Sequence, residues 1–179
     1  FEAERLKREQ KRAMNAFQAQ FSKELAKNVK PQIPKLNSDL ASASTSADVV
    51  TALDSSGLMN APTQGLNLMG PDTARSIGQA YSDICSKFPF LAGNIGRANC
   101  SRLGSSTYGQ CSMSRGAIDF NTKYYGRGNE ASFAASFSNC IATQFHPQGV
   151  MSKGAAYAEA SHELGHAIEG RLEKLMKAA

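Results

Sequence analysis

The sequence has no run of about 18 consecutive apolar residues, the length that a helix needs to span a bilayer, so it predicts no membrane-spanning helix. It also has no C-x-x-C pair, because its successive cysteines lie 15, 11 and 29 positions apart, and this spacing argues against a zinc finger or ribbon. Since nothing indicates a secretory route, reduced and packed thiols are favoured over disulfides. The four thiols are Cys85, Cys100, Cys111 and Cys140.

The start of the given sequence predicts no particular cellular address. It begins with Phe1 rather than Met, and no basic-then-apolar leader with a small-residue cleavage site follows. We therefore expect a fragment or a processed product. The 179 residues, 41% of them apolar, leave room for one domain, or for one domain with an appendage.

Acidic residues are scarce near the start of the chain. Residues 1–30 hold eight Lys or Arg against four Glu, a balance of +4, whereas the whole chain carries +5. A nucleic-acid-binding body would need cations clustered on the folded domain, so we do not expect the remainder to bind nucleic acid. Residues 1–30 could contact DNA or an acidic protein, and the plainer alternative is a solvated helix face.

The apolar pattern divides the chain into three parts. Residues 1–30 are predicted to form a basic amphipathic helix that serves as an arm. Residues 31–71 are predicted to be a linker and irregular chain, because prolines follow the arm and a small, polar stretch covers residues 38–47. Residues 72–179 are predicted to form an α+β domain.

Within that domain, apolar spacing and turn residues indicate a definite order of elements. The sequence predicts a helix over 73–88 with Asp72 as its N-cap, short strands and turns over 90–116, a strand over 117–121, a helix over 129–141, a turn over 145–149 and a last helix over 153–177.

The last helix contains His162-Glu163-Leu164-Gly165-His166, an H-E-x-x-H motif. Residues four apart lie one turn apart on the same helix face, so His162 and His166 could bind one Zn²⁺. Glu163 would lie beside them, where it could act as the general base. We expect Gly165 to allow close packing of another backbone segment. The alternative is two surface histidines on an amphipathic helix.

A catalytic zinc needs a third protein ligand. The extended H-E-x-x-H-x-x-G-x-x-H pattern fails here, and Glu169 lies about 10 Å along the helix axis from His162. His146 is a weaker candidate, because its turn could fold back toward the helix. Asp119 and Glu159 are weaker still. We expect the third ligand to lie beyond residue 179.

These segments together resemble a known family. Residues 72–170 resemble the zincin-like metallopeptidase domain of bacteriophage minor head and head-morphogenesis proteins, which has relatives among phage-borne toxins. The resemblance rests on an ordered set of segments: KFPFL (87–91), AIDFN (117–121), KYY (123–125), FHPQG (145–149) and SHELGHAI (161–168).

The resemblance implies a zincin-like half-domain with a long H-E-x-x-H helix, a small sheet and the extended N-terminal arm. It implies His162 and His166 as zinc ligands and Glu163 as general base. It also implies that a substrate chain lies along a sheet edge formed by Ile118, Asp119, Phe120 and Asn121. The family's downstream third-ligand segment has no counterpart in this chain.

The resemblance leaves several functions open. The chain could be a zinc endopeptidase, a structural virion protein with an inactive zincin-like scaffold, or a phage-borne toxin or effector. A virion protein would occupy the phage head or neck, pass through the host cytoplasm during assembly and contact head, portal or neck proteins. Its arm, residues 1–30, would thread between virion proteins or approach packaged DNA.

Overall fold

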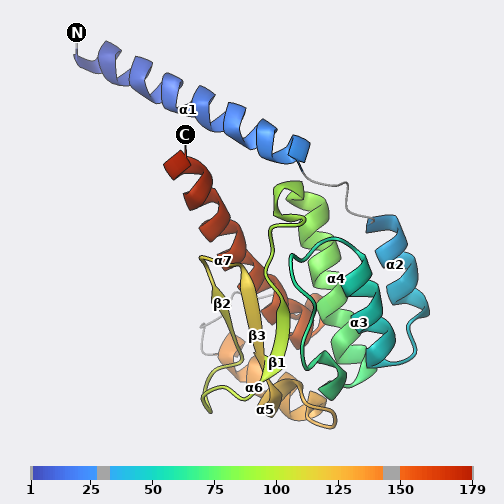
Figure 1. Ribbon diagram of the computed structural model, residues 1–179. Helices are drawn as coiled ribbons and strands as arrows, with labels where there is room; N and C mark the ends of the chain where they lie inside the picture. Colours follow the sequence, from blue (N-terminus) through green and yellow to red (C-terminus); the bar gives the residue numbers. More distant parts are fainter. Residues whose placement is uncertain (1, 28–32, 143–149, 179) are drawn as a thin grey trace.

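The computed structural model describes residues 2–27, 33–142 and 150–178 (Figure 1). This part of the chain is an α+β fold in which α-helices surround one small three-stranded sheet. The helices are α1 (Glu2–Lys27), α2 (Ile33–Ser42), α3 (Ser46–Ser55), α4 (Pro71–Lys87), α5 (Thr122–Tyr125), α6 (Glu130–Ala142) and α7 (Ala155–Ala178). The strands are β1 (Ala98–Ser101), β2 (Gly109–Ser112) and β3 (Ala117–Asn121), and short 3-10 turns are η1 (Leu66–Leu68), η2 (Pro89–Leu91) and η3 (Val150–Lys153).

The sheet has the order β1-β3-β2, with β1 parallel and β2 antiparallel to the central strand β3. Helix α7 contacts both β2 and β3, and α4 packs along α7 (Figure 1). Ile118 and Phe120 of β3 are fully buried, so the core lies between the sheet and these helices. No helix among the described residues is long and apolar enough to cross a membrane.

Several predictions from periodicity are confirmed. β3 has the predicted bounds, and α1, α6 and α7 match the predicted helices to within a few residues. All four cysteines are free thiols, as expected. The prediction of Asp72 as the N-cap of α4 is wrong. Gly70 is the N-cap and Pro71 takes the first helical position, where its missing N–H costs nothing, and Asp72 lies in the first turn.

The prediction of a linker over residues 38–47 is also wrong. This stretch contains the end of α2 and the start of α3, and Leu36 and Leu40 of α2 are buried. Helix α3 begins with a capping box, because the Thr45 side chain accepts from the Asp48 backbone while the Asp48 carboxylate accepts from the Thr45 backbone. The same small polar residues that suggested a linker therefore start a helix.

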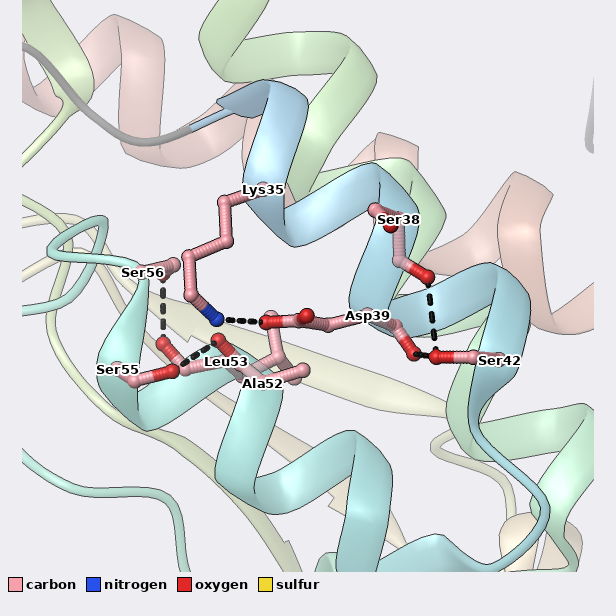
Figure 2. Close-up of polar contacts among 8 residues, drawn as sticks. All are labelled: Lys35, Ser38, Asp39, Ser42, Ala52, Leu53, Ser55 and Ser56. Carbon is pink, nitrogen blue, oxygen red and sulfur yellow. Dashed lines mark hydrogen bonds and ion pairs between the residues drawn. The ribbon is translucent and has the colours of Figure 1, made fainter.

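Serine hydroxyls complete the ends of these two helices (Figure 2). The Ser42 hydroxyl donates to the backbone carbonyls of Ser38 and Asp39 at the end of α2. At the end of α3, the hydroxyls of Ser55 and Ser56 donate in the same way to Ala52 and Leu53. Such bonds satisfy carbonyls that a helix end leaves without partners, so a serine-rich sequence can end a helix well.

Leu40 tests whether α2 belongs to the core. It packs on α4 at Gly78, where an added Cβ would come within 2.7 Å of a Leu40 methyl carbon. We expect Leu40→Ala to lower the free energy of unfolding by about 2–5 kcal/mol, because the substitution leaves a cavity. Half-exposed Leu68 is the control, and Leu68→Ala should cost about 0.5 kcal/mol or less. Equal costs in urea denaturation would show that α2 is not part of the core.

Candidate active site

His162 and His166 bring their rings together on α7. The ring centroids lie 4.9 Å apart with the planes at 88°, and both rings reach toward solvent. One ring nitrogen of His166, Nδ1, lies 3.5 Å from a carboxylate oxygen of Glu169. The prediction that the two imidazoles lie side by side, one turn apart, is confirmed. The pair offers two nitrogen donors in one place, and these are donors that zinc prefers.

The Glu163 side chain lies on the side of α7 that packs against β2. Glu163 and Glu159, one turn before it, are only 5% and 4% exposed. An added Cβ at Gly109 of β2 would lie 3.2 Å from Cγ of Glu163 and 3.6 Å from a carboxylate oxygen of Glu159. The strand therefore comes this close to the two carboxyl groups because Gly109 has no side chain.

The two carboxyl groups are hydrogen-bonded to each other, and burial raises the pKa of both. Burial, followed by the charge of Glu163 and a hydrogen bond to it, raises the pKa of Glu159 to about 8. Burial also raises the pKa of Glu163, while the charge of His166 and the hydrogen bond from Glu159 oppose the rise. Protonated Glu159 thus donates to the Glu163 carboxylate at neutral pH. A carboxylate with a raised pKa is a better base, which suits Glu163 for proton transfer.

A hollow of about 680 Å³ opens beside these carboxyl groups. A substrate side chain could fit into it. Its walls are formed by the N-terminal half of α7, which carries the motif, together with the start of β2, the loop before β2, α5 and α6. The lining residues are Ser105, Ser106, Thr107, Tyr108, Gly109, Tyr124, Cys140, Glu159, His162 and Glu163.

The prediction that Ile118, Asp119, Phe120 and Asn121 form the sheet edge is wrong. β3 lies between β1 and β2 and pairs with both, so it offers no free edge. The strand beside the hollow is β2, which pairs only with β3 within the described sheet. β2 is four residues long and its burial does not alternate, so periodicity gave no signal for it.

Asn121 has a different role from the predicted one. Its buried amide donates to the carbonyls of Gly104 (2.9 Å) and Thr107 (2.7 Å). Its oxygen accepts from the backbone N–H groups of Leu103 and Lys123. The amide therefore fixes the loop that forms one wall of the hollow. The sequence signal for this role was only an Asn at the end of a strand.

Helix α7 is itself held at two places. Near the start of α7, Asp83 of α4 accepts hydrogen bonds from the Lys153 ammonium (2.8 Å) and the Tyr157 hydroxyl (2.7 Å). Further along, Gly170 lies against the backbone of Met113 in the turn between β2 and β3. These contacts fix the axial position of the helix that carries the motif.

The sequence pattern did not predict that two buried tyrosines lie near the carboxyl pair. Tyr81 of α4 and Tyr125 of α5 are fully buried, and within the described chain neither hydroxyl has a hydrogen-bond partner. Burial raises the pKa of both, and the charge of Glu159 raises that of Tyr125 further. Tyr81 fell on the apolar stripe of the predicted helix over 73–88, so sequence pattern alone could not separate it from an ordinary core residue.

The described residues do not complete a metal site. No group of three or more His, Cys, Asp or Glu in residues 2–27, 33–142 and 150–178 is arranged to hold a metal ion. Asp119 instead accepts from the side chain of Asn99 (2.7 Å). His146 and its turn lie outside the described residues, so its role stays a prediction. His162 and His166 thus fit two of the three protein positions of a catalytic zinc.

Comparisons with known proteins add nothing to this geometry. No protein-family model, curated protein or solved structure matches the chain.

The expectation that Gly165 allows close packing is wrong. Gly165 and Gly170 together test how closely other segments pack against α7. Gly165 is exposed and an added Cβ would meet nothing within 4 Å, whereas at Gly170 it would overlap the Met113 carbonyl oxygen. We expect Gly165→Ala to raise the free energy of unfolding by about 0.5–1 kcal/mol through helix propensity. Gly170→Ala should lower it, because backbone must move. Urea denaturation that showed the same change for both would contradict the packing of β2 and β3 on α7.

The raised pKa of Glu159 predicts a pH dependence of stability. Between its ordinary pKa of 4.5 and its folded value of about 8, the folded protein keeps a proton that the unfolded chain has lost. The contribution of Glu159 to stability is therefore complete below pH 4.5 and is lost as the pH rises to 8. Glu159→Gln, which stays neutral, should flatten this decline in thermal unfolding temperatures measured across the window. Exposed Glu4→Gln is the control, and identical slopes for Glu159→Gln and the parent protein would refute the raised pKa of Glu159.

Proposed function

We propose that the chain carries a zinc-dependent peptide hydrolase site in a zincin-like domain. The observation that carries the proposal is the arrangement of α7, with two imidazoles 4.9 Å apart and a buried glutamate between them in sequence. Surface histidines with no common role would have no reason to lie against each other beside a buried acid. The hollow next to Glu163 offers space for a substrate.

The side chains divide the chemistry among themselves. Zinc held by His162 and His166, with a third donor, would polarise a substrate carbonyl and lower the pKa of a bound water. Glu163 takes the proton from the attacking water and passes it to the leaving amine. Glu159 holds the Glu163 carboxyl in place through their hydrogen bond.

The substrate chain is proposed to lie along β2. β2 is an edge strand of the described sheet and its first residue, Gly109, lines the hollow, and an extended peptide can add to such an edge through backbone hydrogen bonds. Gly109 would let the peptide backbone pass close to Glu163. The aromatic rings of Tyr108 and Tyr124 form a wall against which an apolar side chain could pack.

The virion assignment is part of the proposal and is supported by the resemblance of the strand segment at 117–121, combined with the FHPQG segment at 145–149, to phage head proteins. On this proposal the chain belongs to the phage head or neck and contacts head, portal or neck proteins. It would reside in the host cytoplasm during assembly.

A structural scaffold is the second candidate function. It is favoured by the lack of a third metal donor among the described residues. On this reading the zincin-like domain serves assembly, with zinc structural or absent.

Glu163→Gln separates hydrolysis from scaffolding. We expect this variant to keep its zinc, measured by elemental mass spectrometry, while cleavage of fluorescently labelled casein falls by about 10²–10⁴-fold, because the general base is lost. Glu173→Gln, a change at an exposed carboxylate on the same helix that is paired with Lys177, is the control and should retain cleavage.

The double variant His162→Ala/His166→Ala tests the metal itself and should lose its zinc. If this variant kept its zinc, the site would be wrong. Zinc binding by the parent protein without any cleavage would favour the scaffold.

A further inference from the structure

Helix α1 and the end of α7 form an apolar groove far from the candidate active site. In Figure 1, α1 crosses close to the C-terminal end of α7, and the two helices are in contact. The groove between them has a volume of about 590 Å³. Its lining is almost entirely apolar: Gln10, Ala13, Met14, Ala16, Phe17 and Met176.

Two large apolar side chains in the groove are unusually exposed to solvent. Met14 is 57% exposed and Met176 is 66% exposed, whereas Phe17 of α1 is partly buried and Leu175 of α7 is buried. Leu6, two turns before Met14, extends the same stripe and is half exposed. Contiguous exposed apolar surface of this kind marks an interaction site.

Basic side chains flank the stripe on both sides. At 100° per residue, Lys7 and Lys11 fall along one border of the stripe, and Arg5 and Arg12 fall along the other. Glu9 is paired with Arg5 at 3.7 Å, so this acid is already neutralised. In the part of the chain that the structure describes, Lys7, Lys11 and Arg12 have no ion pair.

The α7 side of the groove does not supply the missing negative charge. Glu173 lies near Met176 in sequence, but its carboxylate is paired with Lys177 at 2.6 Å. The rim of the groove therefore keeps a positive excess, and an occupant with acidic flanks and an apolar centre would complement it.

We propose that this groove binds an acidic amphipathic helix from another protein. The stripe from Leu6 to Phe17 runs for about 16 Å, or three helical turns, which matches the anchor spacing of a helix laid in a groove. A second copy would bring the same basic helix against this one and leave like charges opposed. Duplex DNA would satisfy the cations but not the methionines.

The test uses the 179-residue chain and a fluorescein-labelled peptide of about 18 residues. The peptide carries Leu at helical i, i+3, i+4 and i+7 positions and Glu on both flanks. We expect saturable binding in fluorescence polarisation that weakens as salt is raised. A matched peptide with Lys in place of Glu should not bind.

Variants locate the binding surface. Met14→Ser/Met176→Ser should weaken binding by about tenfold or more, because these side chains form the apolar floor. Lys7→Glu/Lys11→Glu should weaken it as well. Met113→Ser is the matched control, since Met113 is an exposed methionine in the turn between β2 and β3, and it should leave binding unchanged.

Other outcomes would overturn the proposal. These are no binding of the acidic peptide, or binding that the methionine pair does not affect. A dimer in light scattering that Met14→Ser/Met176→Ser dissolves would assign the groove to a second copy. Binding of anionic phosphatidylserine vesicles or duplex DNA, with the peptide unbound, would assign the surface to a lipid or nucleic acid.

Discussion

The close packing of β2 on α7 is the contact on which the candidate site depends. Two glycines allow it: a Cβ at Gly109 of β2 would press on the Glu163 side chain, and a Cβ at Gly170 of α7 would overlap the Met113 backbone in the turn after β2. This packing buries Glu159 and Glu163 between strand and helix, while the imidazoles on the next face of the helix stay near solvent. One helix thus presents a shielded acid pair and two accessible nitrogen donors within two turns.

Burying two acids in this way costs stability. A charged carboxylate is disfavoured out of water, and burial accordingly raises the pKa of both Glu159 and Glu163. Tyr81 and Tyr125 add two more buried hydroxyls without partners among the described residues. A chain selected only for stability would place apolar residues at these positions, so the buried polar groups make this region a candidate for a functional site.

Sequence pattern predicted the long elements and the motif, because these depend on local spacing. The 3.6-residue period identified α7 and placed His162 and His166 on one face, and alternation identified β3. Strand order was beyond reach, since pairing with β1 and β2 joins residues distant in the chain. Serine-rich α2 and α3 were missed because composition does not show which hydroxyls bond back to their own helix. The acid pair was readable, since Glu159 and Glu163 are four apart, but its burial was not.

Asn121 has a consequence for how a ligand would enter. The Asn121 amide makes four hydrogen bonds, which join the end of β3, the first turn of α5 and the loop beside the hollow. The Lys123 ammonium and the Tyr124 hydroxyl both donate to the Ser105 carbonyl of that loop. Opening this wall would break these bonds together, so it does not act as a swinging gate. The mouth of the hollow is preformed, so a ligand would be selected by its size and outline, without a closing motion that adapts to it.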